Sequence, residues 1–291
     1  MRARQLARIM SAHSSDALQV ISRSVITHNR ALRALSISAL PNDVVFMVPK
    51  QVLWYWTEAD FEKLHAKARA VIVDYVDSNI DAMHACGIDV HLSTSFVGEQ
   101  ALTKWIAQTN ASGVARTLLH NVDERLQRLP PKNNAASLEI LYVGSPRSTH
   151  LPDAARTKMR VLEGGTPKEF AAARMALTQA NAHFCVRPDP SHLLSRKYKP
   201  FTKGFTAAWC GASMLVNRSV DDAELLLGSD YPFMIDTPSD KDIIEGIQHM
   251  EDAVGGPEWL EALDRGRTLA DRVSPQNLAV ELENIVREVA A

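Results

Sequence analysis

Two lysines four residues apart have the clearest chemical potential in this chain. They lie in the stretch Lys199-Pro-Phe-Thr-Lys-Gly-Phe-Thr-Ala-Ala-Trp-Cys-Gly211. Pro200 is suited to the first position of a helix, and Gly211 to a left-handed cap about three turns later. We therefore expect Lys199 and Lys203 on one face of the first helical turn, beside backbone N–H groups that attract anions. This arrangement would suit a diphosphate. The alternative is that both lysines are simply solvated, although lysine at this end of a helix opposes the helix dipole.

Other polar residues follow segments expected to be strands in the second half of the chain. Gly144, Ser145 and Arg147 form part of a turn after the apolar run 138–143, and Arg187 and Asn217 follow the runs 183–186 and 213–216. A glycine lets the backbone approach a phosphate or sugar closely, and the arginines would add positive charge. Many such turns carry glycine for packing reasons alone, so this reading stays open beside the binding one. A helix-capping role for Ser219 or Asp221 likewise competes with a ligand role for Asn217.

Carboxylates and histidines follow predicted strands in the first half of the chain. Asp74 and Asp77 come after the run 70–73, His91 lies in the run 90–95, and His120 ends the run that starts at Val114. Histidine can accept a proton from a hydroxyl near neutral pH. We select Asp77 and His120 as candidate catalytic residues, with a purely structural role as the alternative for each histidine.

Short apolar runs alternate with helical patterns along the chain, which predicts parallel sheets in an α/β fold. Ligands of such sheets bind outside the carboxyl ends of the strands. Two prolines and two asparagines in residues 129–136 indicate a linker, which predicts domains 1–136 and 137–291. The predicted strands are 44–48, 70–73, 90–95, a fourth from residue 114, 138–143, 183–186, 213–216 and 232–236, and the clearest predicted helices are 58–69, 99–107, 167–181 and 221–227. A further helix is expected through Met83, and Thr166 and Glu169 have the spacing of a capping box at the start of the helix 167–181. The continuous apolar run 44–48 predicts a strand buried on both faces, and a polar stretch is expected from the turn at residue 144 to about Gly165.

Composition excludes several classes of protein. The chain has 291 residues, more than one core usually holds, so two domains are expected. A net charge of −2 gives no bulk attraction to nucleic acid or anionic membranes. Three cysteines without metal-ligand spacing predict reduced thiols, and no run approaches the roughly 20 apolar residues of a transmembrane helix. We expect no metal, no nucleic-acid partner and a cytoplasmic location.

The spacing of Lys199, Lys203 and Gly211 resembles the donor-site helix of GT-B-fold glycosyltransferases. Further segments downstream resemble the carboxyl-terminal half of that superfamily, and the likeness runs from about residue 138 to the end. The segments are Asn217-Arg-Ser-Val-Asp-Asp-Ala223, Asp230-Tyr-Pro232, Gly256-Pro-Glu-Trp259 and Arg272-Val-Ser-Pro275.

The resemblance implies two Rossmann-like domains that face a cleft. The second would hold a nucleotide sugar through Gly144, Ser145, Arg147, Arg187, Lys199, Lys203, Thr206 and Asn217, and the first would hold an unidentified acceptor. The last helix would cross back to the first domain. The nucleotide sugar would be a substrate, and no cofactor would be needed. The metal-binding Asp-x-Asp motif of the other large glycosyltransferase fold is absent around Asp74.

Two departures from that pattern are visible. Thr206 and Tyr198 stand where many such enzymes have glutamates, of which the one at the Thr206 position holds the ribose hydroxyls. Residues 1–39 have helical periodicity and lack a first strand with a glycine-rich turn, so we expect a shortened or remodelled amino-terminal domain. The alternative is that the sequence begins downstream of the native start.

The leading hypothesis is a metal-independent glycosyltransferase that moves a sugar to a hydroxyl group. The alternative is a catalytically inactive GT-B-like protein that binds a nucleotide, a glycan or a partner in an assembly. An epimerase lacks a suitable cluster of acidic residues and histidine, and a dinucleotide oxidoreductase is disfavoured because the sequence has no G-x-G-x-x-G motif.

Overall fold

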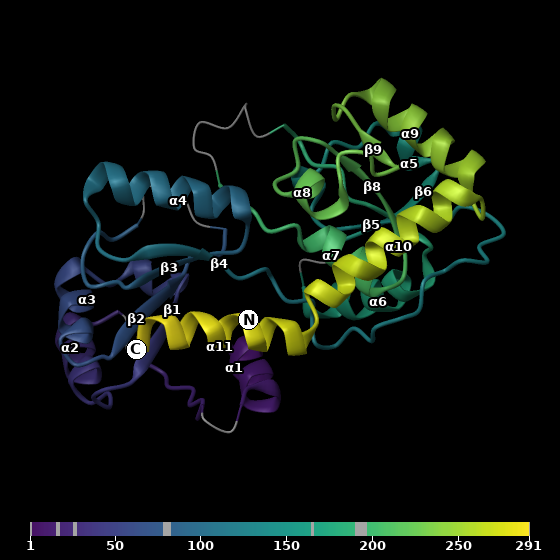
Figure 1. Cartoon of the computed structure of the whole chain (residues 1–291). Coiled ribbons are helices and arrows are strands. Elements are labelled where there is room, and N and C mark those ends of the chain that lie inside the picture. The colour runs from purple at the N-terminus through teal and green to yellow at the C-terminus, as the bar shows by residue number, and fades with distance from the viewer. Residues whose placement is uncertain are drawn as a thin grey trace. The chain divides into compact units, whose positions relative to one another are not determined.

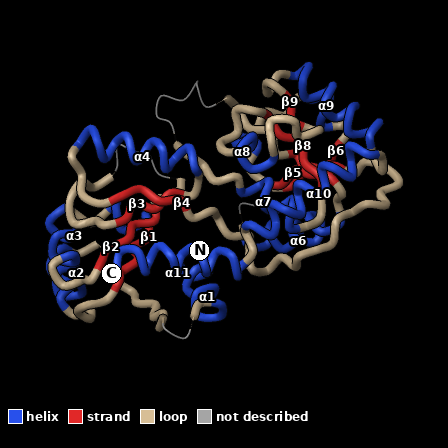
Figure 2. The backbone as a smooth tube through the Cα atoms, viewed as in Figure 1, coloured by secondary structure: helices blue, strands red, loops and turns tan. Residues whose placement is uncertain are grey.

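The computed structural model describes residues 2–15, 18–25, 28–77, 83–163, 166–189 and 197–290. The chain forms two compact units. Unit 1 comprises Met1–Asn121, Ser195–Pro200 and Pro275–Ala291, and unit 2 comprises Val122–Leu194 and Phe201–Ser274. The strands gather into two sheets, one in each unit (Figure 2).

Unit 1 contains a parallel sheet with the strand order β1-β2-β3-β4. Strand order follows chain order, so successive right-handed crossovers place their helices on the same face. One apolar cluster indeed joins Ile37, Phe61 and Leu102, from three different helices, to Val71 and Val73 of the sheet. The strands are β1 (Val45–Pro49), β2 (Ala70–Asp74), β3 (Val90–Ser93) and β4 (Val114–Thr117), and the three helices of this face are α2 (Arg30–Ser38), α3 (Glu58–His65) and α4 (Phe96–Thr109).

Helices from the two ends of the chain complete unit 1. Helix α1 (Arg2–His13) packs against α11 (Pro275–Ala290), and Arg116 of β4 pairs with Glu288 of α11. Figure 1 shows α4 and α11 on opposite sides of this sheet. The last helix thus belongs to the unit formed by the first part of the chain, as the resemblance implied.

Unit 2 contains a five-stranded parallel sheet with the order β6-β5-β7-β8-β9. The chain adds β6 on one side of β5 and then returns to add β7 on the other side, so a topological switch point lies between β5 and β7. The strands are β5 (Ile140–Val143), β6 (Met159–Leu162), β7 (Ala182–Phe184), β8 (Ser213–Asn217) and β9 (Met234–Ile235). The helices are α5 (Asp153–Arg156), α6 (Pro167–Gln179), α7 (Thr202–Trp209), α8 (Ala223–Leu227), α9 (Asp240–Ala253) and α10 (Pro257–Arg272). The described residues also include two 3-10 turns, Lys50–Trp54 in unit 1 and Pro146–Ser148 in unit 2.

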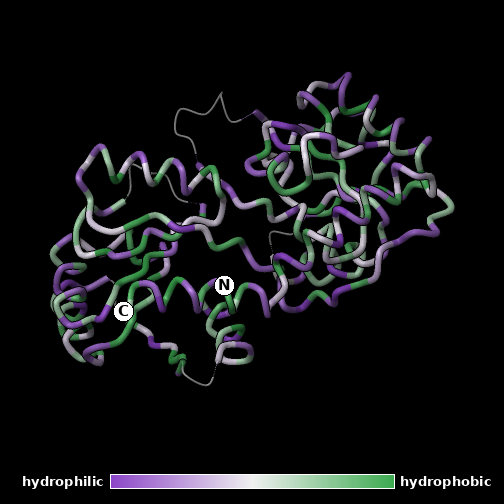
Figure 3. The backbone as a smooth tube through the Cα atoms, in the orientation of Figure 1, coloured by the Kyte–Doolittle hydropathy of each residue, from purple (hydrophilic) through white to green (hydrophobic). Residues whose placement is uncertain are grey.

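Local sequence explains several of these boundaries. Thr166 and Glu169 form the capping box that begins α6, as the sequence predicts. Gly211 adopts a φ of +65° just after α7, which confirms the predicted left-handed cap. Hydrophobic residues lie along strands of both sheets (Figure 3), as expected for parallel sheets covered on both faces.

Several predicted elements are corrected by the structure. Strand β1 is an edge strand and mostly half-buried, whereas its apolar run predicted burial on both faces. Residues 18–25 are not helical, Met83 lies outside any helix, and residues 78–82 are outside the described residues. The stretch after residue 144 contains α5 and β6, which the sequence did not predict. Both elements have only four residues, and β6 lies at the sheet edge with no buried position.

The division into units also differs from the predicted domain boundary. Residues 122–136 group with unit 2, whereas the proline-rich linker placed the boundary at 136/137. The linker docks onto unit 2 through hydrogen bonds, since Leu129 N–H donates to Trp209 O and Lys132 N–H donates to Gly211 O, each at 2.9 Å. A segment with turn composition is therefore fixed to unit 2 by its backbone.

Candidate functional site

The switch point of unit 2 brings together three segments that the sequence analysis had selected. The turn at Gly144 follows β5, Arg187 follows β7, and Lys203 lies in the first turn of α7. In open α/β sheets, ligands bind outside the carboxyl ends of the strands at such a point. The fold therefore places these groups where a ligand of unit 2 is expected.

Tyr142, Gly144 and Lys203 converge at this position. The Lys203 ammonium lies 3.9 Å from the centre of the Tyr142 ring, and the Lys203 Nζ atom is buried. Gly144 has a φ of +146°, which favours glycine. A Cβ atom at Gly144 would lie 3.2 Å from Tyr142 Oη and 3.5 Å from Lys203 Nζ. The glycine thus leaves room for the phenol and the ammonium group to reach the turn.

The positive charges of Lys203 and Arg187 act on buried groups at this position. Cys185 is fully buried at the end of β7, and burial raises the pKa of its thiol to about 12 despite the opposing positive charges of Lys203 and Arg187. Burial likewise raises the pKa of Tyr142 to about 12, again against the charge of Arg187. Both groups are neutral near pH 7, and the charged side chains that act on them include Lys203 and Arg187.

Asn217 holds the backbone of Arg187. Its Oδ1 accepts the Arg187 N–H at 2.9 Å, and its Nδ2 donates to Arg187 O at 3.1 Å and to Ser219 Oγ at 2.8 Å. Asn217 is fully buried. The amide therefore positions the loop that carries Arg187, and these bonds occupy the polar atoms that the sequence analysis had assigned to a ligand.

The predicted pairing of Lys199 with Lys203 on one helical face is wrong. Helix α7 begins at Thr202 with Phe201 as its N-cap, so Lys199 precedes the helix. Lys199 also groups with unit 1, whereas Lys203 belongs to unit 2. The helix begins two residues after Pro200, and only Lys203 of the two lysines is helical.

The remaining predicted donor residues lie in different environments. Thr206 is in α7, where its hydroxyl donates to Thr202 O at 2.9 Å. Ser145 is exposed in the turn after β5, and Arg147 lies in the 3-10 turn Pro146–Ser148. The predicted caps Ser219 and Asp221 are wrong, because the N-cap of α8 is Asp222 in a left-handed conformation without a side-chain capping bond. These placements leave the ligand roles of Thr206, Ser145 and Arg147 as predictions.

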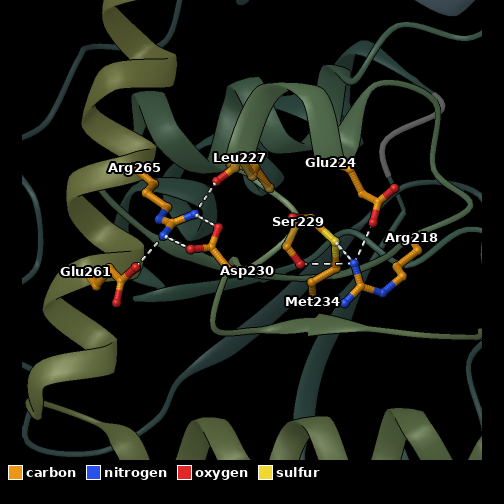
Figure 4. A network of polar contacts seen from close by, with 8 residues as sticks. All are labelled: Arg218, Glu224, Leu227, Ser229, Asp230, Met234, Glu261 and Arg265. Carbon is orange, nitrogen blue, oxygen red and sulfur yellow. Dashed lines mark hydrogen bonds and ion pairs between the residues drawn. The ribbon is translucent and has the colours of Figure 1, made fainter.

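Two arginines fix the loop between α8 and β9 (Figure 4). Arg265 of α10 binds both carboxylate oxygens of Asp230 and donates to Leu227 O. Arg218, after β8, binds Glu224 and donates to Ser229 O at 3.0 Å. This network gives Arg218 a structural role beside the end of β8.

The corresponding edge of the sheet in unit 1 carries a buried ion pair. Arg2 Nε donates to Asp74 Oδ2 at 2.9 Å, and the two side chains are 5% and 2% exposed. Arg2 also donates to the carbonyl oxygens of Leu118 and Leu119. Arg2, at the amino end of α1, therefore connects the end of β2 to the loop after β4 through its hydrogen bonds.

His120 and Asp77, the two candidate catalytic residues, lie in the same part of unit 1. The His120 ring bonds to Asn121 O at 2.7 Å through Nδ1, so Nδ1 carries the proton and Nε2 has the free lone pair. Burial and the charge of Arg2 lower the pKa of His120 to about 4. Asp77 has a φ of +56°, and its side chain is 48% exposed and lies 3.9 Å from Lys50 Nζ. His120 is thus a neutral acceptor of hydrogen bonds near pH 7 and a weaker base than its residue type predicted.

His91 has a structural role, in line with the alternative considered for it. It is fully buried, its Nδ1 accepts from Tyr75 Oη at 3.0 Å, and its Nε2 donates to Ser112 O at 2.9 Å. Both ring nitrogens are therefore used within unit 1.

Sequence reasoning missed Tyr142, Arg2 and Lys50. Tyr142 is part of an apolar strand and belongs to no motif. Arg2 pairs with Asp74, which is 72 positions away in the sequence. The strand-end rule could have selected Lys50, since it directly follows β1. Across the described ranges, no group of three or more His, Cys, Asp or Glu side chains is placed to bind a metal, and no helix is long and apolar enough to cross a membrane.

Comparisons with known proteins give structural likeness without sequence likeness. No family model and no curated protein sequence matches the chain. Sucrose-phosphate synthase from Thermosynechococcus elongatus matches 99% of this chain and 92% of its own at 13% identity, with a TM-score of 0.61. A pneumococcal O-GlcNAc transferase, GtfA, in complex with UDP and GlcNAc matches 89% of this chain at 10% identity, with a TM-score of 0.59.

A third similar structure is an α,α-trehalose-phosphate synthase (UDP-forming) from Burkholderia xenovorans in complex with glucose-6-phosphate. It matches 90% of this chain and 76% of its own at 11% identity, with a TM-score of 0.58. The chain spans 60% of the length of the GtfA chain. All three similar structures are glycosyltransferases of the GT-B class, and the fold of this chain is the GT-B fold.

Proposed function

We propose that the chain is a glycosyltransferase that transfers a sugar from a nucleoside-diphosphate sugar to an acceptor hydroxyl. Unit 2 would bind the donor and unit 1 the acceptor. The nucleotide sugar is a substrate, and the proposal includes neither a metal nor a further cofactor.

The observation that carries the proposal is the presence of two cations, Lys203 and Arg187, at the switch point of unit 2. Bond cleavage at the anomeric carbon leaves negative charge on the nucleoside diphosphate, and fixed cations stabilise that charge most effectively in a partly buried site. Lys203 and Arg187 supply two such cations, and the turn at Gly144 supplies backbone at the same edge. This set of groups can stabilise a leaving diphosphate without a metal ion.

On the acceptor side, the proposal assigns different roles to His120 and Asp77. His120 would orient an acceptor hydroxyl as a hydrogen-bond acceptor, because its pKa of about 4 makes it a poor proton acceptor at pH 7. Asp77 lies three residues beyond the end of β2, its side chain is 48% exposed, and it would accept the proton.

The proposal is tested by a thermal-shift screen against UDP, GDP, TDP and CMP and their sugars. A ligand that binds only the native state at 100 times its Kd raises stability by about 2.7 kcal/mol. We expect one nucleoside diphosphate to stabilise the native protein and to lose this effect in Lys203→Met, which keeps the stem of the side chain and removes the charge. Lys241→Met is the matched control, since the Lys241 side chain is 78% exposed on α9 of the same unit. A screen without a stabilising nucleotide would contradict the proposal.

A second function, binding without catalysis, is favoured by two observations. The Thr206 hydroxyl is bonded to Thr202 O, at the position where a carboxylate would hold the ribose. The end of β2 in unit 1 is occupied by the Arg2–Asp74 pair. If a nucleotide stabilises the protein but no acceptor or water releases nucleoside diphosphate from its sugar, this second function is the better account.

A further inference from the structure

We propose that Tyr142 is a positioning residue for the diphosphate-binding part of unit 2. It would hold the Lys203 ammonium and the turn at Gly144 in one arrangement, so that both meet the same phosphate group. This inference rests on the proposed function, because it concerns the donor site.

The ring of Tyr142 is the first of two contacts. Lys203 Nζ lies 3.9 Å from the ring centre, within the range of a cation–π interaction. The Nζ atom is buried, and such interactions are stronger when the cation is desolvated. The ring is itself fixed, because Tyr142 is fully buried and packs edge to face against Phe184 at 6.2 Å. A rigid face thus fixes the position of a flexible lysine side chain.

The hydroxyl of Tyr142 is the second contact. It donates to Ser145 O at 2.7 Å, three residues further along the chain. This bond closes the turn that follows β5, and Gly144 inside the turn leaves only 3.2 Å between an added Cβ and Tyr142 Oη. One side chain therefore fixes both the turn and the ammonium group beside it.

A purely structural tyrosine would not need this combination. Phenylalanine would fill the same space in the core without a buried hydroxyl, and a buried hydroxyl requires a partner. Here the hydroxyl binds the turn and the ring face binds the cation, and both partners belong to the predicted phosphate-binding set.

The first test measures the binding of inorganic pyrophosphate by calorimetry to the full chain. We expect Tyr142→Leu, which removes both contacts, to weaken binding roughly tenfold, and Tyr142→Phe, which keeps the ring, to weaken it only about two- to threefold. Phe233→Leu is the matched control, because Phe233 is a buried aromatic residue of the same unit that contacts Tyr231 and Trp259. Equal weakening in Tyr142→Leu and Phe233→Leu, or none in either, would overturn the inference.

The deciding spectrum of a second measurement is recorded on the native protein. NMR of the native protein with 13C-labelled lysine should show the Lys203 Hε signals shifted upfield by the Tyr142 ring current. The shift should persist in Tyr142→Phe. Lys203 signals at ordinary lysine positions in the native protein would refute the contact.

The two proposals fail in different ways. If pyrophosphate binding depends on Tyr142 but no nucleoside diphosphate binds, the inference stands and the glycosyltransferase proposal falls. If a nucleoside diphosphate binds but pyrophosphate affinity is indifferent to Tyr142, the inference alone falls.

Discussion

Gly211→Ala is expected to destabilise unit 2 through a backbone clash that cannot be relieved by side-chain rotation. Gly211 follows α7 with a φ of +65°, and an added Cβ would lie 2.0 Å from Pro130 O and 2.7 Å from the Pro130 carbonyl carbon. Because both neighbouring atoms are backbone, the linker has to move away from the end of α7.

The structure gives the size of this effect. The left-handed conformation costs alanine roughly 1 kcal/mol relative to glycine. Displacing the linker also breaks the bonds from Leu129 N–H to Trp209 O and from Lys132 N–H to Gly211 O, both 2.9 Å long. A typical hydrogen bond contributes about 1 kcal/mol to stability, so the free energy of unfolding should fall by about 3 kcal/mol.

Gly255→Ala is the matched control for backbone strain alone. Gly255 has a φ of +74° in the same unit, and its added Cβ would meet only Ala135 O, at an ordinary 3.7 Å. Urea unfolding followed by tryptophan fluorescence reports on unit 2 through Trp209 and Trp259. Gly255→Ala should cost about 1 kcal/mol. Equal costs for the two variants would refute the reasoning that the linker is docked on α7.

Three further predictions concern buried groups. Arg2→Met should lower the free energy of unfolding by about 3–5 kcal/mol, because it leaves the Asp74 carboxylate buried without its cation, and the double variant with Asp74→Leu should recover part of this loss in a double-mutant cycle. Burial lowers the pKa of His183 from 6.5 to about 4, so between pH 6.5 and 4 the unfolded chain binds a proton at this residue and the folded protein does not. The free energy of unfolding should therefore fall as the pH drops from 6.5 toward 4. Urea unfolding at each pH should show a shallower fall in His183→Gln. Cys86 is exposed and should react quickly with Ellman's reagent, whereas Cys185, with its pKa raised to about 12 by burial, should react only on unfolding; a Cys86→Ala variant that still reacts quickly would contradict this.

The sequence predicted elements that depend on local signals. The capping box at Thr166 and Glu169 and the left-handed Gly211 were both identified correctly, because each involves residues within one helical turn. The alternation of apolar runs with helical patterns likewise predicted parallel strands in both units. These features follow from neighbouring residues and need no tertiary context.

Elements that depend on tertiary contacts were missed or misplaced. Strand β6 has only four residues, none of them buried, and its pairing with β5 defines it. Pro200 predicted a helix start two residues before the observed one, because α7 begins at Thr202, after the buried residue Phe201. Lys199 was therefore wrongly placed in the helix. Packing of Phe201 in the core outweighs the local preference of proline for the first helical position.

In the candidate site, too, residues with local sequence signals were predicted and those that depend on tertiary contacts were missed. The strand-end rule selected Gly144 and Arg187, which follow the neighbouring strands β5 and β7 at the switch point, where the chain begins to add strands on the other side of β5. Tyr142 and Arg2 carried no local signal, since their partners are found only after folding. The burial that lowers the pKa of His120 to about 4 is also a tertiary property, and it changes the chemistry expected of that residue.

The central claim is that Lys203 and the turn at Gly144 bind the diphosphate of a nucleotide. The most direct measurement is a crystal structure of the protein with the nucleoside diphosphate that stabilises it most. The account predicts a phosphate oxygen within hydrogen-bond distance of Lys203 Nζ and of the backbone of residues 144–145, at the carboxyl end of β5. A nucleotide bound elsewhere on the chain, or with its phosphates directed away from Lys203, would contradict the account.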